Sequence, residues 1–78
     1  YVRQNLAEAA RAFLVGIQRY PNSKKAPDTM LKLGMALGKL GKVQDACAAF
    51  LEMQSKFTKL RTQVRKRMLK EIQAAGCS

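Results

Sequence analysis

One short pattern occurs twice in this chain. Residues 9–13 and residues 46–50 are both alanine-rich segments that end in phenylalanine, and an aromatic residue follows each at Tyr20 or Phe57, so the offset between the two copies is 37 residues. A period near this length is typical of helical solenoids. One helix pair cannot cover its own apolar stripe, so each unit has to pack against the next. The repeat therefore favours stacked helical hairpins.

Residues 26–57 have the spacing of two amphipathic helices. Apolar side chains recur at three- and four-residue steps, at Met30 and Leu33 in the first half and at Ala46 and Phe50 in the second. This spacing places side chains on one helical face. We therefore expect residues 26–57 to form the central hairpin of the fold.

Glycine and proline mark the ends of the expected helices. Pro21 ends a first helix over residues 1–20, because proline cannot continue the helical hydrogen-bond pattern. Gly41 separates the two helices of the hairpin, and Gly76 caps a last helix over residues 60–75. Glycine suits such positions because it adopts the left-handed backbone conformation without a Cβ clash.

The chain is strongly basic, with 15 Lys and Arg against five Asp and Glu and a formal net charge of +10. Such a charge favours acidic protein surfaces or polyanions, although lysine and arginine also coat ordinary solvated helix faces. A polyanion such as nucleic acid or anionic lipid would be held by Lys56, Lys59, Arg61, Arg65, Lys66, Arg67 and Lys70. Nucleic acid is the weaker expectation, because no zinc-finger spacing or aromatic RNA-binding signature is present.

The two cysteines allow two interpretations. Cys47 lies on the apolar stripe of its helix, so it could be a small buried hydrophobe with Cys77 as a terminal thiol. Alternatively, a Cys47–Cys77 disulfide ties the last helix to the second helix of the hairpin, since antiparallel packing brings these segments together. Such a bond requires an oxidising compartment such as the periplasm.

The residues needed for catalysis or metal binding are missing. The chain has no histidine, no glycine-rich phosphate loop, no closely spaced cysteine pair and only scattered carboxylates. General base catalysis and the common metal sites depend on such groups. We therefore expect no enzyme, no metal site, no cofactor and no small-molecule substrate.

The order of small and bulky residues in the hairpin resembles a tetratricopeptide repeat (TPR). The matching residues are Leu33, Gly34, Ala46 and Phe50, with Ala9, Phe13 and Pro21 resembling the end of a preceding repeat. Within that superfamily, the sequence is similar to the C-terminal domain of the YbgF/CpoB family. This similarity lies in residues 20–28, 31–34, 41–42, 45–47 and 75–77.

The resemblance implies an all-α fold of TPR-like helical hairpins in a short right-handed solenoid. Residues 1–78 then form a single domain, in which residues 1–21 are the end of a preceding repeat, residues 26–58 a full repeat and residues 60–76 a C-terminal capping helix. The contacts between repeats are expected to depend on Ala9, Phe13, Leu33, Gly34, Ala46 and Phe50.

The resemblance also implies a function. The YbgF/CpoB family is periplasmic, acts beside the Tol-Pal complex, and is thought to bind TolA and to help coordinate envelope constriction in cell division. A periplasmic protein-binding scaffold is therefore expected, and a cytoplasmic location is the alternative.

The expected binding surface is the concave face, which the first helix of each repeat lines. In this chain it should include Thr29, Lys32, Met35 and Lys39. The lysines could hold an acidic helix or a carboxylate as point charges. We also expect the first helix of the leading repeat to be absent, so that Leu6, Phe13 and Ile17 expose apolar surface and favour a homo-oligomer.

Overall fold

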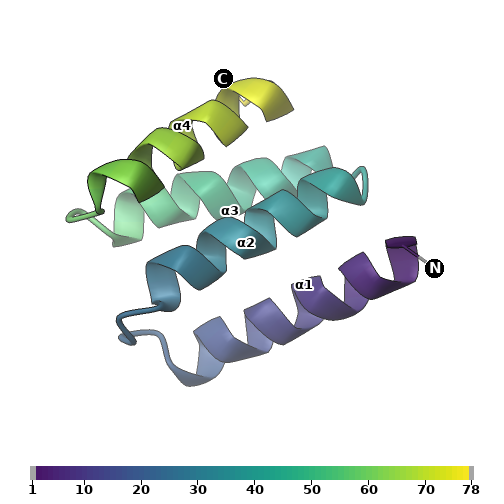
Figure 1. Ribbon diagram of the computed structural model, residues 1–78, viewed down its shortest axis with the longest axis horizontal. Helices are drawn as coiled ribbons and strands as arrows, with labels where there is room; N and C mark the ends of the chain where they lie inside the picture. The colour runs from purple at the N-terminus through teal and green to yellow at the C-terminus, as the bar shows by residue number, and fades with distance from the viewer. Residues whose placement is uncertain (1, 78) are drawn as a thin grey trace.

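The computed structural model describes residues 2–77, so the expected helix start at Tyr1 lies outside the described residues. The helices are α1 (Val2–Arg19), α2 (Ala26–Lys39), α3 (Val43–Lys56) and α4 (Thr62–Ala75) (Figure 1). No strand occurs in residues 2–77. The expected all-α fold of TPR-like helical hairpins is therefore confirmed.

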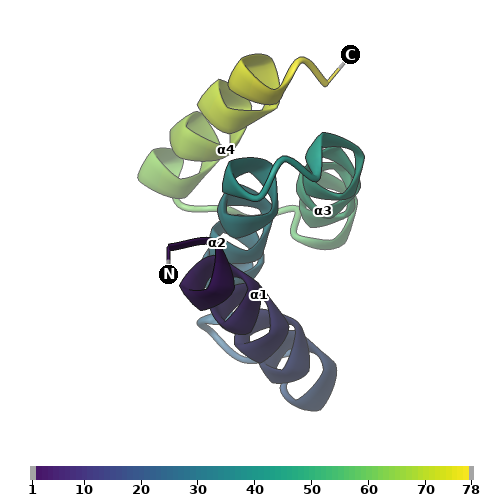
Figure 2. The ribbon, with the colours of Figure 1, turned by 90° about the vertical axis from the view of Figure 1, so that its right-hand side faces the viewer.

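Helix α2 is the centre of the arrangement. It packs against α1, α3 and α4, whereas α1 packs against α2 alone among the described elements (Figures 1 and 2). The molecule measures 35 × 29 × 18 Å. Along the shortest axis α3 lies behind α2, whereas α1 and α4 lie on either side of α2 (Figures 1 and 2). The side of α2 that no helix covers has Asp28, Lys32 and Lys39 as exposed residues.

The contact between α2 and α3 depends on a glycine and a phenylalanine. A Cβ added at Gly34 would meet three ring carbons of Phe50 at 2.8 Å or closer, so only glycine leaves room for the ring. Phe50 is 2% exposed, and Ala46 and Met53 are fully buried beside it. Close approach of the two backbones therefore requires the small residue that the sequence places there.

Helix α2 buries more than the single stripe expected from the sequence. Leu31 and Ala36 are buried in addition to Met30, Leu33 and Gly34. The reason is that α2 has neighbours on more than one side. By contrast, Val43 at the start of α3 is 42% exposed, although it belongs to the apolar stripe in sequence.

The sequence predicts that the last helix begins at Leu60. In the structure, helix α4 begins two residues later, at Thr62. Arg61 has an extended backbone (ψ 146°), and Leu60 packs against the core from the link that precedes the helix. Met68 is the one residue of α4 that is fully buried, with Val64 and Ile72 partly buried beside it. Leu60 is therefore apolar because it contacts the core, although it lies in the link and not in the helix.

Cys47 and Cys77 form a disulfide, with their Cα atoms 5.6 Å apart. Gly76 has a positive φ of 73° and turns the chain after α4. This turn is closed by the N–H of Cys77, which donates to the carbonyl of Ile72 at 3.0 Å. Of the two interpretations of the cysteines, the structure therefore has the bonded pair.

The apolar surface of α1 differs from the one expected. Ile17 is only 8% exposed because it packs in the core, and Leu6 and Phe13 are partly buried. The large apolar side chains that α1 exposes are Leu14 and Val15, at 44% and 41%. Self-association of the chain stays a prediction.

Among the described residues, no helix is long and apolar enough to cross a membrane.

Candidate binding groove between α2 and α4

One stripe of α2 points away from the hairpin core. It consists of Asp28, Lys32, Met35 and Lys39, at steps of three and four residues, and all but Met35 are exposed. Three of the four residues predicted to bind a partner belong to it, namely Lys32, Met35 and Lys39. Thr29 lies instead at the seam with α1, in a hollow that Gly16 and Tyr20 also line.

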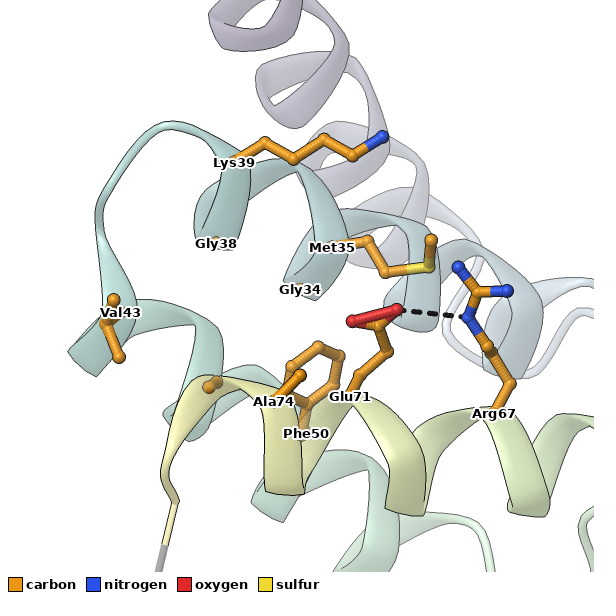
Figure 3. A pocket seen from close by; sticks show the side chains of 10 residues that line it. Gly34, Met35, Gly38, Lys39, Val43, Phe50, Arg67, Glu71 and Ala74 are labelled. Carbon is orange, nitrogen blue, oxygen red and sulfur yellow. Dashed lines mark hydrogen bonds and ion pairs between the residues drawn. The ribbon is translucent and has the colours of Figure 1, made fainter.

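The wall opposite this stripe is α4. Arg67, Glu71 and Ala74 face Met35 and Lys39 across a hollow of about 290 Å³ (Figure 3). We call this space the smaller hollow. It exists because α4 crosses beside α2 without covering the outward stripe, so the two helices form the sides of a groove.

The floor of the smaller hollow is made of small and apolar residues. Gly34 and Gly38 contribute no side chain, and Phe50 closes the bottom from α3 (Figure 3). Because both glycines lie on α2 one turn apart, they lower one side of the floor. The result is an apolar depression with charged groups at its rim.

Each wall carries one ion pair within its own helix. Lys32 Nζ lies 3.1 Å from Asp28 Oδ2 on α2, and Arg67 Nε lies 3.0 Å from Glu71 Oε1 on α4. Three of these four side chains are more than half exposed. Pairs of this type contribute about 0.3 to 0.5 kcal/mol each, so they orient side chains more than they stabilise the fold.

A second and larger hollow lies along the same side of α2, at the end where α2 and α4 begin. This larger hollow has a volume of about 720 Å³ and lies between the start of α2 and the link before α4. Its charged lining residues are Lys24, Lys25, Asp28, Lys32, Lys59 and Arg61. Five cations thus surround one carboxylate, and that carboxylate is already paired with Lys32.

The seven basic residues expected to hold a polyanion occupy different parts of the surface. Lys59 and Arg61 line the larger hollow, and Arg67 lines the smaller one. Arg65 lines a separate hollow between α3 and α4, and Lys56 lies 5.7 Å from the ring centroid of Phe57. Lys66 and Lys70 are exposed. The seven residues are therefore divided among three hollows and other exposed positions.

The chemistry of the groove is that of a binding surface. Over residues 2–77, no three His, Cys, Asp or Glu side chains lie close enough together to hold a metal ion. The polar side chains that line the two hollows are lysine, arginine, glutamine and carboxylate groups. Such groups can bind charged and apolar side chains of another molecule.

Sequence reasoning missed the α4 wall and the Lys24–Lys25 contribution. The signal for α4 was the four-residue spacing of Gln63, Arg67 and Glu71, which lies on the side opposite the exposed Leu69. No local signal connects the link before α2 with the link before α4, because only packing places these two segments together.

Comparison with protein families supports a TPR-type domain. Residues 28–59 match the family model described as tetratricopeptide repeat, and the match runs from the first turn of α2 to the link before α4. Neither the search of curated proteins nor the search of solved structures found a match. Stacked helical repeats of this type create concave surfaces that bind other proteins.

Proposed function

We propose that this TPR-type domain is a non-catalytic protein-interaction module whose groove between α2 and α4 binds a polypeptide segment. The observation that carries the proposal is the groove itself, with an apolar floor at Gly34, Gly38 and Phe50 and charged walls on both sides. Eleven residue steps separate Asp28 from Lys39, which corresponds to roughly 16 Å along the helix axis. A short helix or an extended segment of a few residues spans that distance.

The division of the chain follows from this proposal. Residues 26–58 act as the complete repeat, residues 1–21 as the end of a preceding one, and residues 60–76 as the capping helix. The cap then has a second role, because α4 supplies one wall of the groove.

For the partner we propose TolA, with the domain acting as a periplasmic scaffold that helps coordinate envelope constriction in cell division. The support is the resemblance of residues 20–28 and 45–47 to the YbgF/CpoB family. The Cys47–Cys77 disulfide adds to it, because such bonds persist in oxidising compartments.

The experiment uses titration calorimetry with a helical segment of TolA and two tryptophan variants. Ala74→Trp fills the smaller hollow, whereas Gln73→Trp, the matched control, adds the same side chain at the neighbouring exposed position of α4 that does not line it. We expect Ala74→Trp to weaken binding about tenfold or more and Gln73→Trp to change it little, because only the first blocks a desolvated pocket. Equal affinities for the two variants would rule out the groove as the site.

The proposed location has a separate test. Cell fractionation should place the natural protein in the periplasm, and mass spectrometry without reductant should find Cys47 and Cys77 bonded. Recovery from the cytoplasm with two free thiols would contradict the scaffold role in the envelope while leaving the groove proposal untouched.

A further inference from the structure

We propose that the groove recognises an acidic peptide in one orientation, with carboxylates in the larger hollow and an apolar side chain in the smaller hollow. This inference rests on the proposed function and specifies the chemistry of its ligand. It follows from three features of the larger hollow: its uncompensated charge, the residues at which two helices begin, and its lack of aromatic residues among those described as lining it.

The first feature is charge. Asp28 is the only acidic residue among those that line the larger hollow, and Lys32 holds it at 3.1 Å. Lys24, Lys25, Lys59 and Arg61 have no ion pair to any described carboxylate. Four cations therefore converge on one concave space without a counter-charge from the chain, and they would be satisfied by carboxylates from a partner.

The second feature is the start of two helices. Lys25 precedes α2 and Arg61 precedes α4, and neither side chain caps its own helix. At α2 the N–H of Lys25 donates to Ser23 Oγ at 3.1 Å and Asp28 is an acid in the first turn, whereas the first turn of α4 has no acid. Serine, threonine, aspartate or asparagine normally occupies this position, and a cation there opposes the helix dipole. Residues that break a local rule without a gain to the fold often belong to a functional site. An anion in the hollow would therefore compensate chiefly the start of α4, which has no acid of its own.

The third feature distinguishes a peptide from nucleic acid. Among its described lining residues the larger hollow has no aromatic side chain on which a base could stack.

The adjacent apolar floor strengthens this distinction. Lys32 and Gly38 are six residues apart on α2, or about 9 Å along the axis. A peptide places acidic and apolar side chains within that distance, whereas a polyanion has no group for the apolar hollow.

The test measures binding of a labelled peptide that has a run of glutamates at one end and a leucine at the other. The charge-reversal pair Lys59→Glu with Arg61→Glu should weaken its binding about tenfold or more. The matched pair Lys66→Glu with Lys70→Glu causes the same change in net charge outside both hollows and should leave binding nearly unchanged. Equal losses in the two pairs would show that binding follows net charge alone and would overturn the proposal.

A single variant separates a ligand role from a structural one. Arg61→Asp supplies a side chain that can cap α4, so its melting temperature should rise while peptide binding weakens. If Arg61 had only a structural role, the more stable variant would bind at least as well. Unchanged or tighter binding by Arg61→Asp would therefore contradict the proposal.

Control probes distinguish this inference from the proposed function. Suppose that a peptide with glutamine in place of glutamate binds as tightly as the acidic one, and that Ala74→Trp blocks both. This result would support the groove as the binding site and would contradict its specificity for acidic peptides. If Ala74→Trp affects neither peptide, the groove fails as well. Tighter binding of single-stranded DNA or anionic vesicles through Lys59 and Arg61 would instead support a polyanion ligand.

Discussion

The α2–α3 hairpin and helix α4 are attached to the same core in different ways. The hairpin buries ten residues, six on α2 and four on α3, with Phe50 and Met53 at 2% and 0% exposure. Helix α4 is as long as either hairpin helix but fully buries Met68 alone. Its end is held instead by the disulfide between Cys47 and Cys77. Packing thus stabilises one region, and a covalent bond completes the attachment of the other.

This difference matters for the groove, because its two walls come from the two regions. The α2 wall is part of the packed hairpin, whereas the α4 wall depends on Met68, on partly buried neighbours and on the crosslink. A region with few buried apolar contacts opens locally at a lower free energy than the rest of the domain. Local opening should therefore displace Arg67 and Glu71 on α4 more readily than Lys32 and Met35 on α2.

The largest effect on stability is expected when a buried side chain is removed from the core of the hairpin. Phe50→Ala should lower the free energy of unfolding by about 3 to 5 kcal/mol, because a buried ring is lost and a cavity remains. Denaturant unfolding of the oxidised protein measures this change, and Leu51→Ala, at a 47% exposed position of the same helix, is the control. A similar small loss in both variants would show that the hairpin is not the packed region described here.

The next effect comes from the crosslink. Replacing both Cys47 and Cys77 by alanine should cost about 3 to 4 kcal/mol, since the two residues are 30 positions apart and the closed loop restricts the unfolded chain. Hydrogen exchange should show protection lost first in α4, with α2 and α3 less affected. Uniform loss of protection over the three helices would show that α4 does not depend on the disulfide more than the α2–α3 hairpin does.

The smallest effect tests the contact between Gly34 and Phe50. Gly34→Ala should destabilise the native protein by about 1 to 3 kcal/mol, because the added Cβ overlaps the ring and overpacks the core. In a Phe50→Ala background the same change should be stabilising by about 1 kcal/mol, since alanine is a better helix former than glycine. A double-mutant cycle measures this reversal of sign. Additive effects would show that the two residues do not interact.

The sequence by itself determined the helices and most of their contacts. Apolar spacing, Pro21, Gly41 and Gly76 mark the helices to within two residues at the ends that are described. The repeated pattern also predicted stacked hairpins, and residues 28–59 match the tetratricopeptide repeat model. These features are local or depend on helix periodicity, so a linear pattern records them.

Only the tertiary structure decided which side chains meet across the groove. Thr29 and Lys32 are three residues apart in sequence, yet one faces α1 and the other lines the larger hollow. Lys24 and Arg61 are far apart in sequence and come together because α2 and α4 begin at the same end of the molecule (Figure 1). The angle at which one helix crosses another is set by the summed packing of all its contacts. No short stretch of sequence carries that information.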